Sequence, residues 1–268
     1  MANLRLIALA GGIVASVATV WLLRTAPEPA TLDIAAPSAA NSAVSTPQPQ
    51  PPEAEIPTRE QPIATQPPLP PLPLLDDSDQ WLRQQSTALV PSALRQQLDL
   101  WLASSDLLRR SSAYIDGLAR GQLMSSIFPL TAPSDRFISH TSNGSLWMNA
   151  GNYDRYNATV DLITALDAEQ LVALFHRARP LLVAAFSELG YTQRQMDGAV
   201  LAALEQILAT PVIVEPIELT RESVAFRYAD PRLEGLSRLQ KQLLRSGPDN
   251  TQRLQSLARD LRQRLLEQ

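Results

Sequence analysis

The sequence predicts a mainly helical globular domain with one or two small β-hairpins, preceded by a single transmembrane helix and a disordered proline-rich linker. Three observations support this fold class: an uncharged apolar stretch near the start, a proline-rich segment, and a long remainder with apolar residues at helical spacing. They place an anchor over residues 1–25, a linker over 26–75 and the folded domain over 76–268. A domain of that length can bury one substantial core.

Residues 6–23 contain no charged side chain and are almost wholly apolar. A helix over this stretch is about 27 Å long, which is just enough for a hydrocarbon core of about 30 Å. A cleaved signal peptide is the alternative, but Arg24 and Pro27 disrupt the small-residue cleavage pattern around Ala26. We therefore predict a single-pass membrane protein. Arg5 favours a cytoplasmic N-terminus and hence a C-terminal domain on the opposite side of the membrane.

The linker holds 14 of the 22 prolines, and Ala, Gln, Ser and Thr make up most of its other residues. Such a composition cannot bury enough apolar surface to offset the entropy lost on ordering. Within it, PPLPPLP at 67–73 predicts polyproline II structure. This stretch is either a stiff spacer or a docking motif for an aromatic-lined surface.

Two consecutive helices, over residues 168–189 and 193–209, are the predicted centre of the domain. In both, apolar residues recur three or four positions apart. Asp167 with Gln170, and Thr192 with Gln195, predict the two helix starts, and Gly190 predicts the stop between them. Such wide apolar stripes have to be buried, so we expect this pair to form the core.

The other elements follow from local signals. Helices are predicted over residues 77–89, 91–102, 106–120, 153–166, 231–244 and 249–265. Two strands over 137–142 and 145–149 flank Asn143-Gly144, which favours the type I′ turn of a hairpin. Alternating apolar residues from Ile217 to Tyr228 predict a second hairpin.

Four strings give the domain a family resemblance: NYxRY at 152–156, FHRARP at 175–180, YADP at 228–231 and QKQLLRxGP at 240–248. Together they resemble a bacterial family known as domain of unknown function 3014, over residues 75–268. The resemblance implies the layout of anchor, linker and domain in a bacterial envelope. We therefore expect the anchor in the bacterial inner membrane and the C-terminal domain in the periplasm. It implies no activity and no catalytic residues.

Two groups of side chains are candidates for weak ligand or partner binding. The first crowds aromatic, amide and guanidinium groups into ten positions: Trp147, Asn149, Asn152, Tyr153, Arg155 and Tyr156. Such side chains can stack on sugar rings or bind peptide groups. The alternative is structural: the aromatic rings pack in the fold and the asparagines form turns. The second comprises His176, Arg177 and Arg179 next to Pro180, which breaks the helical hydrogen bonding and suggests an anion or peptide site. Its alternative is the ordinary polar face of an amphipathic helix.

Several classes of function lack support. The chain has no cysteine and only two histidines, so we expect no metal and no cofactor. No phosphate-binding loop, nucleophile elbow or zinc-protease motif is present. Carboxylates such as Asp116, Asp154, Asp161 and Glu188 could form a glycosidase pair, but the sequence does not bring any two together. Catalytic residues therefore stay unknown, and nucleic acid is not an expected partner.

The function that the sequence favours is a membrane-anchored binding or scaffold module in the periplasm. Its expected partners are the membrane through residues 6–23, an envelope protein, and a second copy of the chain, because small residues four apart in the anchor allow helix pairing. The alternative is an enzyme that modifies cell-wall glycan or peptidoglycan, with Tyr153 and Arg155 in its site. A third possibility is a lipid-surface module that uses the arginine-rich last helix.

Overall fold

The structure is a computed structural model that describes residues 51–58, 70–102, 105–124, 136–222 and 225–267. The helices are α2 (Ser78–Thr87), α3 (Arg95–Trp101), α4 (Leu107–Ala119), α5 (Asn157–Thr164), α6 (Ala168–Glu188), α7 (Gln193–Leu208), α8 (Pro231–Glu234), α9 (Arg238–Ser246) and α10 (Pro248–Leu266). Three 3₁₀ turns are η2 (Leu75–Asp77), η3 (Ser92–Leu94) and η4 (Ala150–Tyr156). The strands are β1 (Ser139–Ser142), β2 (Ser145–Met148), β3 (Glu218–Glu222) and β4 (Ala225–Tyr228).

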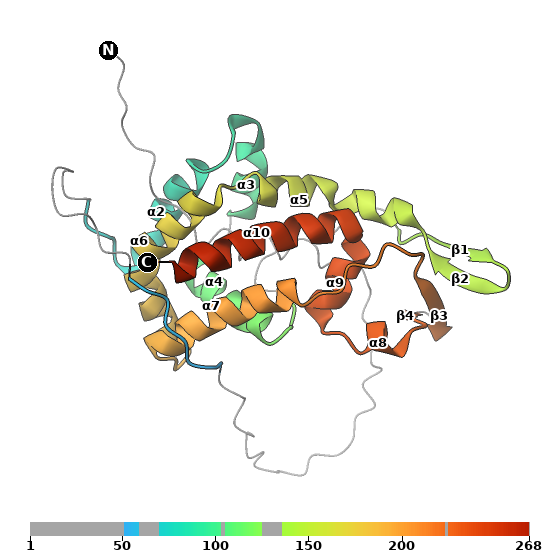
Figure 1. The fold of residues 1–268 in the computed structure, drawn as a ribbon. Coiled ribbons are helices and arrows are strands. Elements are labelled where there is room, and N and C mark those ends of the chain that lie inside the picture. Colours follow the sequence, from blue (N-terminus) through green and yellow to red (C-terminus); the bar gives the residue numbers. More distant parts are fainter. Residues whose placement is uncertain (1–50, 59–69, 103–104, 125–135, 223–224, 268) are drawn as a thin grey trace, which may run out of the picture.

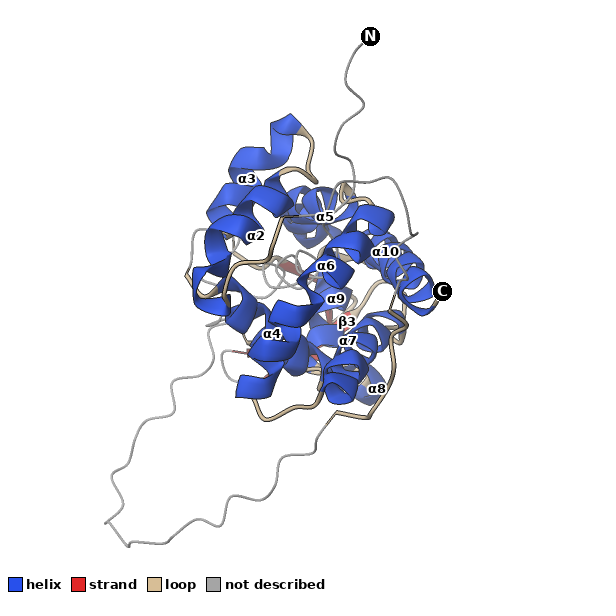
Figure 2. Ribbon diagram, turned by 90° about the vertical axis from the view of Figure 1, so that its left-hand side faces the viewer, coloured by secondary structure: helices blue, strands red, loops and turns tan. Residues whose placement is uncertain are grey.

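The predicted central pair, α6 and α7, lies in the middle of the helical body. Helix α4 packs against both of them from one side and α10 from the other. Figure 1 shows α10 between α5 and α7, with the sheet at the opposite end of the body from the C-terminus. The end-on view in Figure 2 shows the helices grouped around a common centre.

The main core lies among these helices, and its largest fully buried side chains include Tyr114, Tyr156, Phe175 and Phe186. Burial of the predicted stripe on α6 is confirmed, because Leu174 and Phe186 are at most 1% exposed. A second, smaller cluster lies beneath the sheet. It consists of Met148, Ile217, Leu219, Tyr228 and Leu244.

The two predicted hairpins form one sheet. All four strands pair in antiparallel fashion in the order β1-β2-β3-β4. The central contact is short: Leu146 faces Leu219 and Trp147 faces Glu218. The Asn143-Gly144 turn has the expected positive φ angles of 50° and 81°. Sequence patterns do not reveal the β2–β3 pairing, because its strands are about 70 residues apart.

Several helices begin or end where capping residues and glycines in the sequence predicted. Thr192 accepts a hydrogen bond from the Gln195 amide and Gln195 accepts one from Thr192, which completes a capping box at α7. The Asp167 carboxylate caps α6 at the Gln170 amide, 2.9 Å away. Gly190, with φ +84°, ends the helix as predicted.

The predicted single helix over 231–244 is wrong, because the structure divides it into α8 and α9. Ser237 and Gln240 form a second capping box, which starts α9 anew after Gly235. The predicted helix over 153–166 also differs, since its first turn belongs to η4 and α5 begins at Asn157.

The predicted fold class needs a correction in its membrane part. No helix in the described part of the chain is both long and apolar enough to span a bilayer. The helix predicted over 6–23 lies outside the described residues. The fold seen is therefore mainly helical with one small four-stranded antiparallel sheet, and the transmembrane helix is not part of it.

The predicted linker over 26–75 also needs correction. Residues 51–58 lie on the helical body, and Ile56 is part of the main core. Leu72 and Leu75, nearer the end of the predicted linker, pack against the same core. The remaining residues, 26–50 and 59–69, lie outside the described part.

Candidate functional site

Residues 51–58, which we call the docked segment, have no regular secondary structure and lie along the start of α7 (blue in Figure 1). They contact Arg194, Asp197 and Gly198 of α7, and Arg179 of α6 pairs with Asp197. We call these four residues the docking site. Three prolines restrict the backbone of the segment, so it loses less conformational entropy on binding than an ordinary chain of its length.

Ile56 is the anchor of the docked segment. Its side chain is 1% exposed and belongs to the same cluster of buried residues as the α6 and α7 stripes. Burial of an isoleucine side chain stabilises a structure by about 1.5–3 kcal/mol. The segment is therefore fixed to the domain chiefly by one aliphatic side chain.

The backbone of Ile56 is recognised by a buried ion pair. Its N–H donates to Oδ2 of Asp197 over 3.0 Å, and the same oxygen lies 2.5 Å from Nη2 of Arg179. The side chains of Asp197 and Arg179 are only 1% and 9% exposed. Burial raises the pKa of the Asp197 carboxyl, and the Ile56 N–H and the Arg179 guanidinium offset part of that rise because they stabilise the carboxylate.

Gly198 gives the docked segment room to approach α7. A Cβ atom at this position would lie 1.6 Å from the carbonyl oxygen of Pro52 and 2.8 Å from its carbonyl carbon. Because both are backbone atoms, no side-chain rotation could relieve the overlap. Glycine inside a helix is otherwise unfavourable, so close backbone approach explains its presence.

Arg194 contacts the acidic part of the segment. Its carbonyl oxygen accepts a hydrogen bond from the Ala54 N–H over 3.0 Å. Its guanidinium lies 3.4 Å from the Glu53 carboxylate and 3.8 Å from that of Glu55. These charged groups are more than half exposed, so the ion pairs contribute little stability and chiefly favour acidic residues at these positions.

The second predicted group of site residues lies partly at this docking site. Arg179 holds Asp197, and its guanidinium also lies 5.6 Å from the centre of the Phe175 ring. Arg177 donates a hydrogen bond to the carbonyl of Pro70, in the part of the predicted linker that adjoins the domain. His176 packs edge-on against the Phe175 ring. Arg177 thus contacts a backbone carbonyl and Arg179 a buried carboxylate, and the anion or peptide site stays a prediction.

The first predicted group connects the sheet to the helices. Asn152 is buried, and its side-chain amide makes two hydrogen bonds with the backbone of Ile138. Its Oδ1 accepts from the Ile138 N–H over 2.8 Å, and its Nδ2 donates to the Ile138 carbonyl over 2.6 Å. Asn149 caps η4 at the Gly151 amide, 2.8 Å away. These are the bonds of a turn, and they occupy both sides of the Asn152 amide and the side-chain oxygen of Asn149.

The two tyrosines of the first group pack against other parts of the protein. Tyr156 is 1% exposed, and the Arg155 guanidinium lies 5.9 Å from the centre of its ring. Tyr153 is half-buried beside Gly247, where a Cβ atom would approach its ring to 2.5 Å, and burial raises the pKa of its hydroxyl. The enzyme alternative, which placed Tyr153 and Arg155 in its site, stays a prediction.

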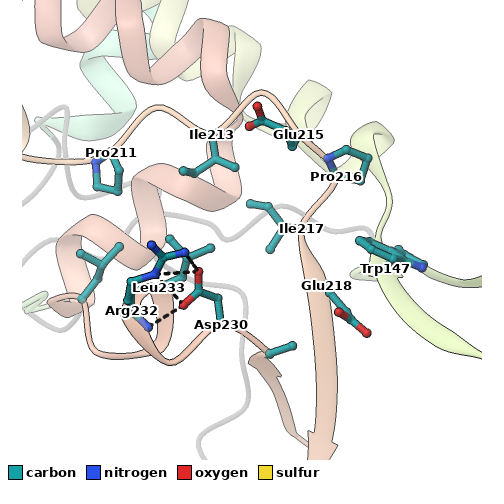
Figure 3. Close-up of a pocket in the computed structure, with 12 residues that line it drawn as sticks. Trp147, Pro211, Ile213, Glu215, Pro216, Ile217, Glu218, Asp230, Arg232 and Leu233 are labelled. Atoms are coloured by element: carbon teal, nitrogen blue, oxygen red, sulfur yellow. Dashed lines mark hydrogen bonds and ion pairs between the residues drawn. The ribbon is translucent and has the colours of Figure 1, made fainter.

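Trp147, the remaining member, lines a pocket at the base of the sheet (Figure 3). The pocket has a volume of about 740 Å³. Its lining residues are Trp147, Pro211, Ile213, Glu215, Pro216, Ile217, Glu218, Ala229, Asp230, Arg232, Leu233 and Leu236.

Among the described residues, no three histidine or carboxylate side chains are arranged to hold a metal ion.

Asp197, Gly198 and the docked segment are site residues that sequence reasoning missed. Two weak signals pointed to them. Gly198 interrupts an otherwise good helix, which often marks a close backbone approach. Ile56 is an isolated apolar residue among prolines and glutamates.

Comparison with known proteins gives one match. The model of the family described as "Protein of unknown function (DUF3014)" matches residues 107–262, which include α4 through most of α10. This confirms the family that the four sequence strings predicted. No curated protein and no solved structure matches the chain.

Proposed function

This chain belongs to the DUF3014 family of proteins of unknown function, and we propose that its domain is a binding module for a short peptide segment. The peptide has an aliphatic side chain next to a proline, with acidic residues before it. The single observation that carries this proposal is the seating of Ile56, whose side chain enters the core while its N–H bonds to the buried Asp197–Arg179 pair.

Recognition through backbone N–H groups allows the docking site to bind a partner segment with a composition similar to that of residues 51–58. The Asp197 carboxylate and the Arg194 carbonyl bind N–H groups that every residue except proline supplies. Selectivity then comes from the buried position of the isoleucine and from the charge of Arg194. The chain's own segment occupies the site, so a partner has to replace it.

A peptide added in solution competes at a disadvantage with a segment in the same chain. A tethered segment acts at an effective concentration in the millimolar range. The test therefore uses the full chain with Ile56→Asp, in which an unpaired carboxylate disfavours the buried position and releases the segment. A labelled peptide of residues 51–58 should bind this variant saturably in fluorescence anisotropy, and the unmodified chain at least about tenfold more weakly.

Two controls define the result. The same peptide with aspartate in place of its isoleucine should not bind, because it lacks the anchor. Circular dichroism shows whether the Ile56→Asp chain keeps its helices. Failure of the native peptide to bind a folded Ile56→Asp chain would contradict the proposal and leave the docked segment as a purely structural part of the domain.

The identity of a natural partner goes beyond this test. An envelope protein as that partner, and the bacterial envelope as the location, stay predictions from the sequence. In-cell crosslinking of the full chain tests them, and the expected partner has an acidic segment with an isoleucine or valine before a proline. Capture of partners without such a segment would count against the docking site as the contact.

A further inference from the structure

The pocket at the base of the sheet is a second candidate site. Strands β2 and β3 and helix α8, which supply part of its lining, lie at the other end of the helical body from the docked segment (Figure 1). Its volume of about 740 Å³ lies within the usual range of small-ligand sites. Ile213, Ile217, Leu233 and Leu236 supply apolar lining. Next to it, Val214 is 74% exposed, so apolar surface extends beyond the pocket itself.

Trp147 and Glu218 lie together at one side of this pocket (Figure 3). They are directly opposite residues in the β2–β3 pair, and such partners have Cβ atoms about 5 Å apart on one face of a sheet. The Trp147 indole N–H donates to the Ser142 carbonyl over 3.3 Å, which helps to orient the ring. An aromatic face next to a carboxylate is a favourable environment for a cation.

The charges around the pocket are complementary to a cation. Three carboxylates line it, from Glu215, Glu218 and Asp230, against the single cation of Arg232. Arg232 is already bound to Asp230, with Nη2 2.8 Å from Oδ2 (Figure 3). No cation in the described part of the chain forms an ion pair with Glu215 or Glu218. The charge available to a ligand is therefore negative.

We infer that this pocket binds an arginine side chain of a partner peptide, with an aliphatic neighbour of that arginine against the apolar lining. The planar guanidinium can stack on the Trp147 ring and donate two hydrogen bonds to the Glu218 carboxylate, which a lysine ammonium cannot do. The Glu215 carboxylate, which also lines the pocket, adds electrostatic attraction for the guanidinium. This site takes a basic ligand, in contrast to the acidic segment at the docking site, and stands independently of it.

The test is a titration of the full ¹⁵N-labelled chain with acetyl-Leu-Arg-Leu-amide, followed by the indole N–H resonance of Trp147 in NMR spectra. We expect a saturable shift. The matched peptide with citrulline in place of arginine has the same shape without the charge and should bind about tenfold more weakly. Equal binding of the two peptides, or no saturable shift with arginine, would overturn the proposal.

Variants on the same strand locate the contact. Glu218→Gln removes the carboxylate with little change in shape and should weaken binding about tenfold. Glu222→Gln is the control, since Glu222 is also exposed on β3 but does not line the pocket and pairs with Arg227. Equal loss of affinity in both variants would show a general charge effect and refute the site. Both changes are on exposed side chains, so we expect both variants to fold.

Discussion

Replacing Asp197 by alanine is expected to lower the free energy of unfolding by about 3–5 kcal/mol, because it leaves the Arg179 guanidinium buried without its counter-charge. Both side chains are less than a tenth exposed, so water does not replace the lost carboxylate. The Ile56 N–H loses its acceptor at the same time. Chemical denaturation of the full chain measures the change.

Two further variants separate the ion pair from other effects. Replacing both Arg179 and Asp197 by leucine removes the two charges together. This should recover much of the loss, leaving the cost of the orphaned Ile56 N–H at about 1–3 kcal/mol. Asp161→Ala breaks an exposed pair with Arg253 and should cost at most about 1 kcal/mol. A loss for Asp197→Ala as small as that for Asp161→Ala would show that the pair does not hold the docked segment.

Gly198→Ala is the second substitution with a large expected effect. The informative result is whether it raises or lowers the free energy of unfolding. In a helix interior, alanine is ordinarily about 1 kcal/mol more favourable than glycine. Here the added Cβ meets the Pro52 carbonyl at 1.6 Å, and the docked segment has to leave. Loss of the buried Ile56 side chain then costs about 1.5–3 kcal/mol, so we expect net destabilisation.

Cleavage by a glutamate-specific protease reports release of the segment, because Glu53 and Glu55 lie within it. We expect the cleavage rate there to rise about 10- to 100-fold in Gly198→Ala, in line with the lost burial. The double variant with Ile56→Asp supplies the control, since its segment is already released. In that background Gly198→Ala should stabilise the helix, and destabilisation there would point to a cause other than the segment.

Most helices were predictable from the sequence because their signals are local. The Thr192–Gln195 capping box, the Gly190 stop and the Asn143-Gly144 turn each depend on residues within four positions of one another. The split between α8 and α9 was equally local. It was missed because Leu236, Leu239 and Leu243 continue an apolar stripe across the Ser237 cap.

Of the four docking-site residues, only Arg179 was predicted as a site residue from the sequence. Arg177 and Arg179 were candidates for a peptide site from their place beside Pro180, but the acid that Arg179 needs is 18 positions away on the next helix. Ile56 is 141 positions from Asp197, and its proline-rich surroundings have the composition of a linker. Contacts so distant in the chain leave no periodic pattern. The same holds for the β2–β3 pairing that brings Trp147 next to Glu218.

Amide hydrogen exchange at Ile56 in the unmodified full chain tests the central claim most directly. If its N–H is bound to the buried Asp197 carboxylate, exchange should be at least about 100-fold slower than in a free peptide of the same sequence. Asp197→Ala should remove that protection. Exchange of Ile56 at the free-peptide rate in the unmodified chain would mean that the segment does not dock, and the binding module proposed from it would have no support.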